Sequence, residues 1–241
     1  MNQNRPSILL LLIGAVLLLA ACGASAPPAA VSPEAAGLAW RERPIAPGAT
    51  DWRQAEAYFG EQFWPAWDDA DRAAAGVRTE RGHRLTIGTG VFETRMVAIP
   101  ILNLDLYLLA RNGRLNKVHL GRFTTYSPDL GLLSVADQAA WAFDDGRTST
   151  VVYGGADLRS AYAADAVYAP YALDGKLIVV ARRGEQYIVV YDGQQVGPTF
   201  DAITIAYCCE PAMYTARGGA GRYTFWGERR GVRYAVQISK K

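Results

Sequence analysis

Cysteine and histidine side chains supply many of the nucleophiles, bases and metal ligands of proteins, and this chain has few of them. Its three cysteines are Cys22 and the adjacent pair Cys208–Cys209, and its two histidines are His83 and His119. The cysteine pair has no CxxC spacing and no companion histidine, which a zinc or soft-metal site would use. The sequence therefore predicts neither a metal site nor a cofactor.

The cysteine pair has three interpretations. In an oxidising compartment, Cys208 and Cys209 can form a vicinal disulfide that stiffens a turn, although the peptide bond between them must distort. They can instead be buried thiols that behave as small apolar residues. A redox or soft-metal role, with Met213 nearby, is the third interpretation, and the sequence leaves all three open.

Candidate acids and bases do not form a recognisable catalytic set. No nucleophile motif such as Gly-x-Ser-x-Gly accompanies His83 or His119, so we expect a structural role for both histidines. Carboxylate pairs that cleave glycosides are defined by their spacing in space, which one sequence does not reveal. The first acids to examine are Glu93, Asp105, Asp157 and Asp201. We predict no catalytic residue and no enzymatic activity.

The first residues are typical of an export signal. Arg5 precedes an apolar run over 8–19, which is too short for a permanent membrane span. Leu19-Ala20-Ala21-Cys22 resembles the lipobox of bacterial lipoproteins. The resemblance implies that residues 1–21 are removed and that lipid on Cys22 anchors the protein to a membrane. It also implies an extracytoplasmic location, on a periplasmic or cell-surface face.

Composition divides the rest of the chain in two. Residues 22–49 are rich in Ala and Pro, which predicts a stiff, extended linker behind the lipidated cysteine. Residues 50–241 are long enough for one domain with a sizeable core. Without the signal the chain has 24 basic and 23 acidic residues, and this near-neutral balance gives no reason to expect nucleic acid as a partner.

One amphipathic helix is expected at the start of the domain. Thr50 or Asp51 can cap it, and Pro65 would end it. Its apolar face is broad and mainly aromatic, which favours packing on the domain that follows. The residues of this face are Trp52, Ala55, Tyr58, Phe59 and Phe63. The acidic group Asp68, Asp69 and Asp71 lacks a calcium-loop pattern and is interpreted as a solvated turn.

Beyond residue 84 the pattern becomes one of short β-strands separated by turns. Asn-Gly and Asp-Gly pairs mark hairpin turns at 112–113, 145–146, 174–175 and 192–193. A strand–turn–strand unit at 174–193 recurs at 221–236 and 140–154, and a fourth copy lies at 104–120. The interval between copies is that of a propeller blade. Continuous Val and Ile runs indicate strands covered on both faces, and the many tyrosines are interpreted as packing residues.

The unit at 171–193 resembles the WD-type blades of TolB and related periplasmic proteins, and Ser127-Pro128-Asp129 repeats part of their turn. This resemblance implies a mostly β, antiparallel repeat fold: a small or incomplete propeller of about four or five blades, preceded by one N-terminal helix. A β-meander or sandwich is the alternative. The leading functional hypothesis is a lipid-anchored binding or scaffold protein that holds a protein partner. A carbohydrate or cell-wall binding module and a secreted hydrolase or thiol redox protein are the alternatives.

Overall fold

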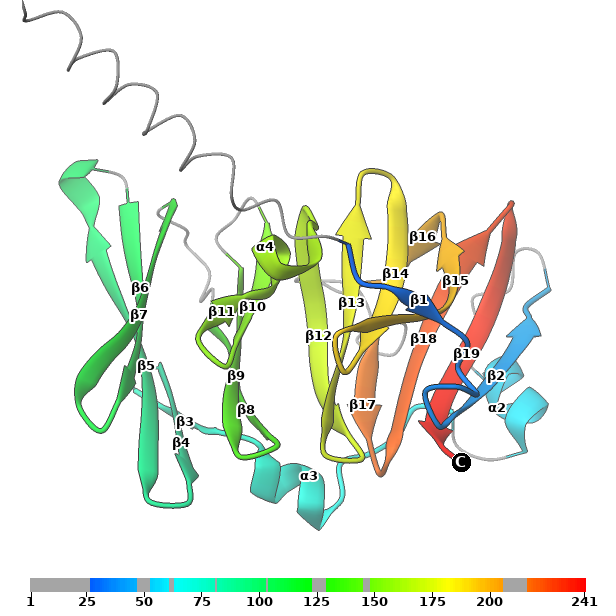
Figure 1. Ribbon diagram of the computed structural model, residues 1–241, viewed down its shortest axis with the longest axis horizontal. Coiled ribbons are helices and arrows are strands. Elements are labelled where there is room, and N and C mark those ends of the chain that lie inside the picture. The colour runs from blue at the N-terminus through cyan, green and yellow to red at the C-terminus, as the bar shows by residue number, and fades with distance from the viewer. Residues whose placement is uncertain are drawn as a thin grey trace, which may run out of the picture.

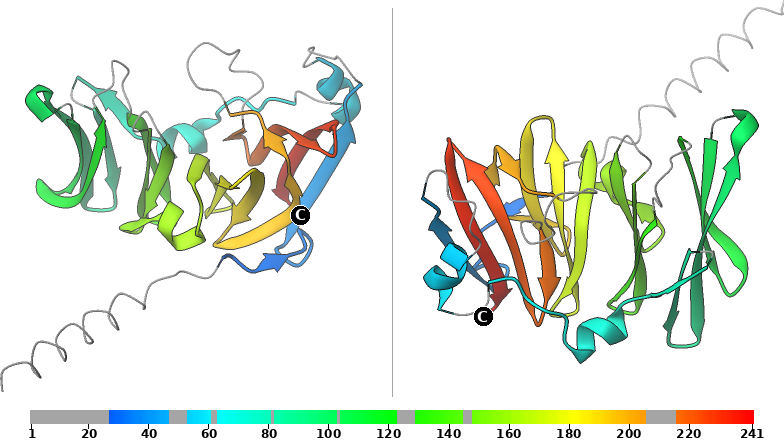
Figure 2. Two further views of the ribbon diagram at one scale, coloured as in Figure 1. Left: turned by 90° about the horizontal axis from the view of Figure 1, so that it is seen from above. Right: turned by 180° about the vertical axis from the view of Figure 1, so that it is seen from behind.

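The computed structural model describes residues 27–46, 53–60, 63–80, 82–102, 104–122, 129–144, 148–205 and 216–241. It is mostly β, with several antiparallel sheets, none of which closes into a barrel. Four sheets stand face to face in an open row (Figures 1 and 2). We number them I to IV from one end of the row to the other.

Sheets I and II form the first half of the row. Sheet I contains the strands β3 (Val77–Thr79), β4 (Gly82–Ile87), β5 (Gly90–Ile99), β6 (Leu104–Arg111) and β7 (Arg114–Arg122), and the 3-10 turn η1 (Pro100–Leu102) joins β5 to β6. Sheet II contains β8 (Asp129–Val135), β9 (Gln138–Asp144), β10 (Ser149–Tyr153) and β11 (Ala156–Asp157). The short helix α4 (Leu158–Tyr162) leads from sheet II into sheet III.

Sheets III and IV each combine consecutive strands with one strand from the N-terminal segment. Sheet III contains β12 (Ala166–Leu173), β13 (Lys176–Arg183), β14 (Gln186–Tyr191) and β15 (Gln194–Phe200), and β1 (Ala30–Val31) pairs in parallel with β15. Sheet IV contains β16 (Ala202–Ile203), β17 (Arg217–Gly219), β18 (Arg222–Arg229) and β19 (Val232–Lys240). The strand β2 (Leu38–Pro44) pairs antiparallel along β19 and becomes its outer neighbour.

Each of the four repeated sequence units forms one antiparallel hairpin in one sheet. These hairpins are β6–β7, β9–β10, β13–β14 and β18–β19. The expected turns at 112–113, 174–175 and 192–193 have positive φ at both central residues, as type I′ turns require. The turn expected at 145–146 lies outside the described residues.

Strands in the middle of the row are buried on both faces because successive side chains point to opposite sides. In β13, Leu177 and Val179 pack toward sheet II, while Ile178 and Val180 pack toward sheet IV. Sheet II behaves in the same way, with Trp141 directed at sheet I and its neighbour Ala142 directed at sheet III. This double burial explains the continuous apolar runs and confirms their interpretation.

The N-terminal segment differs from the expected order of elements. Two strands, β1 and β2, precede the helix, and both lie within the segment 22–49 that was expected to be a spacer. Leu38 is fully buried in the core between sheets III and IV. Pairing along β19 satisfies the backbone of β2, which offsets the cost of ordering a Pro-rich segment. The antiparallel pattern also has one exception, since β1 is parallel to β15.

The expected helix is shorter than its apolar pattern. Helix α2 (Arg53–Phe59) ends at Gly60, whose φ of +68° and hydrogen bond to Glu56 O terminate it before Pro65. Of its expected stripe, Ala55, Phe59 and Phe63 pack on sheet IV, whereas Tyr58 is exposed and Trp52 lies outside the described residues. The buried cluster contains Ile45, Ala55, Phe59, Phe63, Trp64, Trp226 and Ala235.

A connecting segment then returns the chain from sheet IV to sheet I along one edge of the row (Figures 1 and 2). This segment, 63–76, contains the helix α3 (Asp69–Ala74). Asp68 caps α3 and Asp71 completes a capping box, so the acidic group is not the solvated turn that the sequence predicted. Asp71 is buried, and its carboxylate accepts hydrogen bonds inside the structure.

Candidate functional site

The candidate site begins with an irregularity in β12. A β-bulge shifts the register between Tyr168 and Tyr171, so that Ala169 and Pro170 together oppose one residue of β13. Ala169 has a φ of +48°, an uncommon conformation for a residue with a side chain, and Pro170 has no N–H for the ladder. Bulges of this kind are enriched beside functional sites.

Two adjoining cavities lie over this bulge. Cavity A has a volume of about 330 Å³ and cavity B about 530 Å³. Both are within the range of pockets that hold small ligands or side chains of a partner. They share Trp67 and Leu133, the bulge residues Ala169 and Pro170, and Ala216. We call the two cavities together the linker groove, because the connecting segment 63–76 contributes to both.

The wall formed by the connecting segment is held by Asp71. One carboxylate oxygen of Asp71 accepts the Ala220 N–H at 2.7 Å and the Asp68 N–H at 2.9 Å. The Tyr171 hydroxyl also hydrogen-bonds to Asp71, and the Gly221 N–H donates to that hydroxyl at 3.0 Å. Burial, followed by the contact with Asp71, raises the pKa of Tyr171. Asp71 thus joins α3 to sheets III and IV.

The far end of the connecting segment is fixed to sheet II. Gly76 donates its N–H to Leu132 O at 2.8 Å, and Ala75 forms a bridge with Leu133. A Cβ at Gly76 would lie 2.8 Å from the Leu132 Cβ, so the approach depends on glycine. Since both ends of α3 are attached to sheets, the groove is a formed cleft with a defined shape.

Arg217 is a basic residue in the lining of cavity B. Its guanidinium lies 5.3 Å from the centre of the Trp64 ring, and no carboxylate among the described residues forms an ion pair with it. Its Nε is buried without a hydrogen-bond partner, and burial lowers the pKa of Arg217. Arg217 is half-buried, and a partly desolvated cation without a counter-ion is less stable than one in water. A carboxylate or backbone carbonyl of a bound partner would stabilise it.

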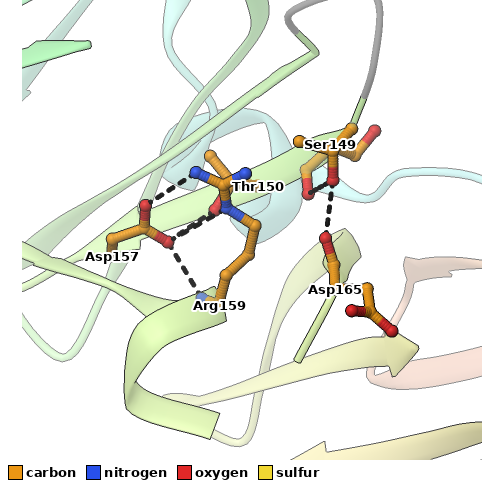
Figure 3. A network of polar contacts seen from close by, with 6 residues as sticks. Ser149, Thr150, Asp157, Arg159 and Asp165 are labelled. Atoms are coloured by element: carbon orange, nitrogen blue, oxygen red, sulfur yellow. Dashed lines mark hydrogen bonds and ion pairs between the residues drawn. The ribbon is translucent and has the colours of Figure 1, made fainter. Parts of the chain in front are cut away.

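Hydroxyl groups in cavity A are committed to neighbouring carboxylates. Ser149 Oγ donates to Asp144 at 2.6 Å, and Thr150 Oγ1 donates to Asp157 at 2.8 Å. Figure 3 shows the Asp157 carboxylate accepting hydrogen bonds from the Thr150 hydroxyl and from the backbone N–H and guanidinium of Arg159, at the start of α4. Burial alone would raise the pKa of Asp157, but hydrogen bonds from Arg159 and Thr150 outweigh it and lower the pKa. This network caps α4 and closes the wall of the cavity.

The expected site residues are dispersed over the row. Glu93 forms an ion pair with Arg84 on sheet I, and Asp201 accepts the Arg230 N–H beside sheet IV. Asp157 caps α4, and Asp105 lies on β6, where only its backbone is described. The four acids therefore lie on different sheets or strands and do not form one described carboxylate pair.

The histidines, cysteines and tyrosines that the sequence singled out are only partly within the described residues. His83 on β4 lines cavity A, and His119 lies on β7 with its side chain outside the described residues. Cys22, Cys208 and Cys209 also lie outside the described residues. Most described tyrosines are buried or half-buried in the core, which confirms their packing role: Tyr153, Tyr162, Tyr168, Tyr171, Tyr187, Tyr191, Tyr223 and Tyr234.

Sequence reasoning missed the groove, although one signal was present. Pro170 stands inside the strand-like run of β12, and a proline in such a run marks an edge or a bulge. Trp67 and Arg217 carry no motif, and they meet at the groove through contacts between distant segments. Neither the bulge nor these two residues were among the predicted site residues.

No protein family, curated protein or solved structure gives a significant match to the chain. Within the described ranges, no group of three or more His, Cys, Asp or Glu side chains is placed to hold a metal ion. The helices of the described part are too short or too polar to cross a membrane. The linker groove is thus the feature on which a functional assignment of this chain depends.

Proposed function

We propose that this chain is a lipid-anchored, extracytoplasmic binding protein that holds an apolar segment of a protein partner in the linker groove. The observation that carries the proposal is the groove itself, formed over a β-bulge between attached elements. Its walls are mainly apolar, and Arg217, which has no ion-pair partner among the described residues, offers a cation at which a carboxylate or carbonyl of the partner would bind.

The four sheets are, in this proposal, the blades of an open β-propeller of the WD type. The support is the assignment of one repeated hairpin to each sheet and the face-to-face order of the row. The N-terminal strand β2 also completes the last sheet of the row by pairing with β19.

The lipid attachment is tested at the cysteines. The change Cys22→Ser should abolish incorporation of labelled fatty acid and release the protein from the membrane fraction, because the acylated residue is lost. Cys208→Ser is the matched control and should keep both the label and the membrane association. Continued labelling of the Cys22→Ser chain would refute the lipoprotein assignment.

Partner binding is tested by filling the groove. Ala70 and Ala73 are both exposed residues of α3, but only Ala70 lines cavity B. We expect the parent chain to co-purify from membranes in mild detergent with a stoichiometric amount of its partner. Ala70→Trp should therefore lower the amount of partner that co-purifies, whereas Ala73→Trp should leave that amount unchanged. If both variants recover equal amounts of the same partner, the groove is not its site. Recovery of glycan rather than protein would favour the carbohydrate-binding alternative.

A further inference from the structure

The outer part of sheet I carries apolar side chains in water. Ile101 is 97% exposed and Leu102 61% exposed, both in the turn η1. Met96 and Val97, at the end of β5 that leads to this turn, are each 44% exposed. Surfaces that combine several large exposed apolar side chains usually contact another surface. We call residues 96–102 the β5–β6 tip.

The tip is exposed on both faces, which distinguishes it from the rest of sheet I. Neighbouring residues of a strand point to opposite sides, so Met96 and Val97 face opposite ways. Nearer the base of the same strand, Phe92 is buried against sheet II and Thr94 is also buried. The tip therefore extends past the core at the top of sheet I (Figure 1). A flat partner could cover one of its faces, whereas a lipid layer surrounds an inserted hairpin on both.

Charge is segregated in the same sheet. Residues 77–122 contain eight Arg or Lys and three Asp or Glu, a net charge of +5, whereas the other residues from Cys22 onward contain 16 basic and 20 acidic residues. Arg95 is exposed directly before Met96, and Arg78 and Arg84 are exposed on β3 and β4, whereas the exposed Arg111 and Arg114 lie at the other end of the sheet, where β6 turns into β7. A second copy of the chain would meet this sheet with like charge, which disfavours pairing of two such faces.

We infer that the β5–β6 tip is a second membrane contact, which inserts η1 at the surface of an anionic phospholipid layer while the basic residues of sheet I attract that layer. Apolar insertion together with a net positive charge on the same element binds peripheral proteins to anionic membranes, and here Arg95 adjoins the exposed Met96 while the whole sheet carries the net charge of +5.

The test uses the full chain in nanodiscs of phosphatidylcholine alone or mixed with phosphatidylglycerol, with amide hydrogen exchange as the readout. Exchange in the β5–β6 tip should be slower by on the order of tenfold in the anionic discs, and added salt should reduce this difference. The double change Ile101→Ser and Leu102→Ser should remove the protection. Val232→Ser, at an exposed apolar residue where β19 begins at the other end of the row, should not.

Two results would overturn the inference. One is equal exchange at the tip in neutral and anionic discs. The other is protection in detergent without phospholipid that increases with protein concentration, which would assign the tip to contact between copies of the chain. Co-purification with phosphatidylcholine discs reports the proposed lipid anchor separately. When anionic vesicles are added in excess, hydrogen exchange at the tip can be measured even for a chain without a lipid anchor. Failure of the anchor and failure of the tip contact are therefore distinguishable.

Discussion

The two ends of the row of sheets are finished differently. At the sheet IV end, α2 and the residues after it cover the outer face, where the Trp64 ring lies 6.5 Å from the Trp226 ring. At the sheet I end, Val77, Val97 and Val118 remain exposed on the outer face, so no described element covers them. An antiparallel sheet at the end of such a row can be covered by a further element or can leave its outer face in water. The capped end contributes to stability, and the uncapped end is available for contact with another surface.

The largest expected difference between the ends is in stability. Phe63 is fully buried against Phe59 and Trp64, with ring centres 5.2 and 4.6 Å apart. Phe63→Ala should lower the free energy of unfolding by about 3–5 kcal/mol, because it leaves a cavity under the cap. Ile101→Ala at the uncapped end should change it by less than about 0.5 kcal/mol. Urea denaturation measures both, and equal losses would contradict the comparison.

The connection between the two ends should be nearly as sensitive. Asp71→Ala removes an acceptor for the Asp68 and Ala220 N–H groups and for Tyr171, and it breaks the capping box of α3. We expect a loss of about 2–3 kcal/mol in the free energy of unfolding. Asp69→Ala, at a fully exposed acid of the same helix, should cost less than about 1 kcal/mol. A similar cost for the two changes would show that Asp71 does not hold the segment.

Alkaline pH should weaken the interior of the row through Tyr162. Burial, followed by Tyr153 and Asp192, raises the pKa of Tyr162 to about 12. The neutral phenol therefore contributes stability below the unfolded pKa of about 10, and this contribution is lost as the pH rises toward the folded value. As the pH rises from about 10 to about 12, the free energy of unfolding should fall less in the Tyr162→Phe variant than in the parent chain. The difference between the two decreases should reach about 2–3 kcal/mol. Chemical denaturation at each pH measures the difference, and a Tyr162→Phe chain with the same pH dependence as the parent would contradict the prediction.

The smallest effect is expected on the outer face of sheet I. The ion pair between Arg84 and Glu93 spans 3.8 Å with both side chains partly in water. Such pairs contribute little to stability, so Glu93→Gln should change the free energy of unfolding by less than about 0.5 kcal/mol. A larger change, measured by thermal or urea denaturation, would mean that this face is covered in solution and that the two ends are more alike than the fold indicates.

Much of the β architecture could be predicted because its signals are local. Asn112-Gly113 and Asp174-Gly175 form the hairpin turns that they predicted, since glycine and small polar residues adopt positive φ at low cost. The helix was placed correctly but extended too far, because the left-handed conformation of Gly60 ends it before the apolar pattern does. The acids at 68–71 were misinterpreted because a capping box and a solvated turn use the same residue types.

The site could not be predicted because its parts are distant in the sequence. Trp67, Pro170 and Arg217 line one cavity from the connecting segment, sheet III and sheet IV. Their side chains have no common motif or spacing, and only the path of residues 63–76 along the row places them together. The charge of sheet I was hidden in a different way. It cancels against the acidic remainder of the chain, so the total near zero gave no indication of it.

By itself the sequence determined the strand-rich character, the repeated hairpins and their turns, because pleated strands and tight turns depend on residues that are near one another. Tertiary structure decided which sheet received β2, which end of the row was capped, and where the bulge of β12 met α3. Those features depend on apolar area buried between segments distant in the chain, an energy that no local pattern records.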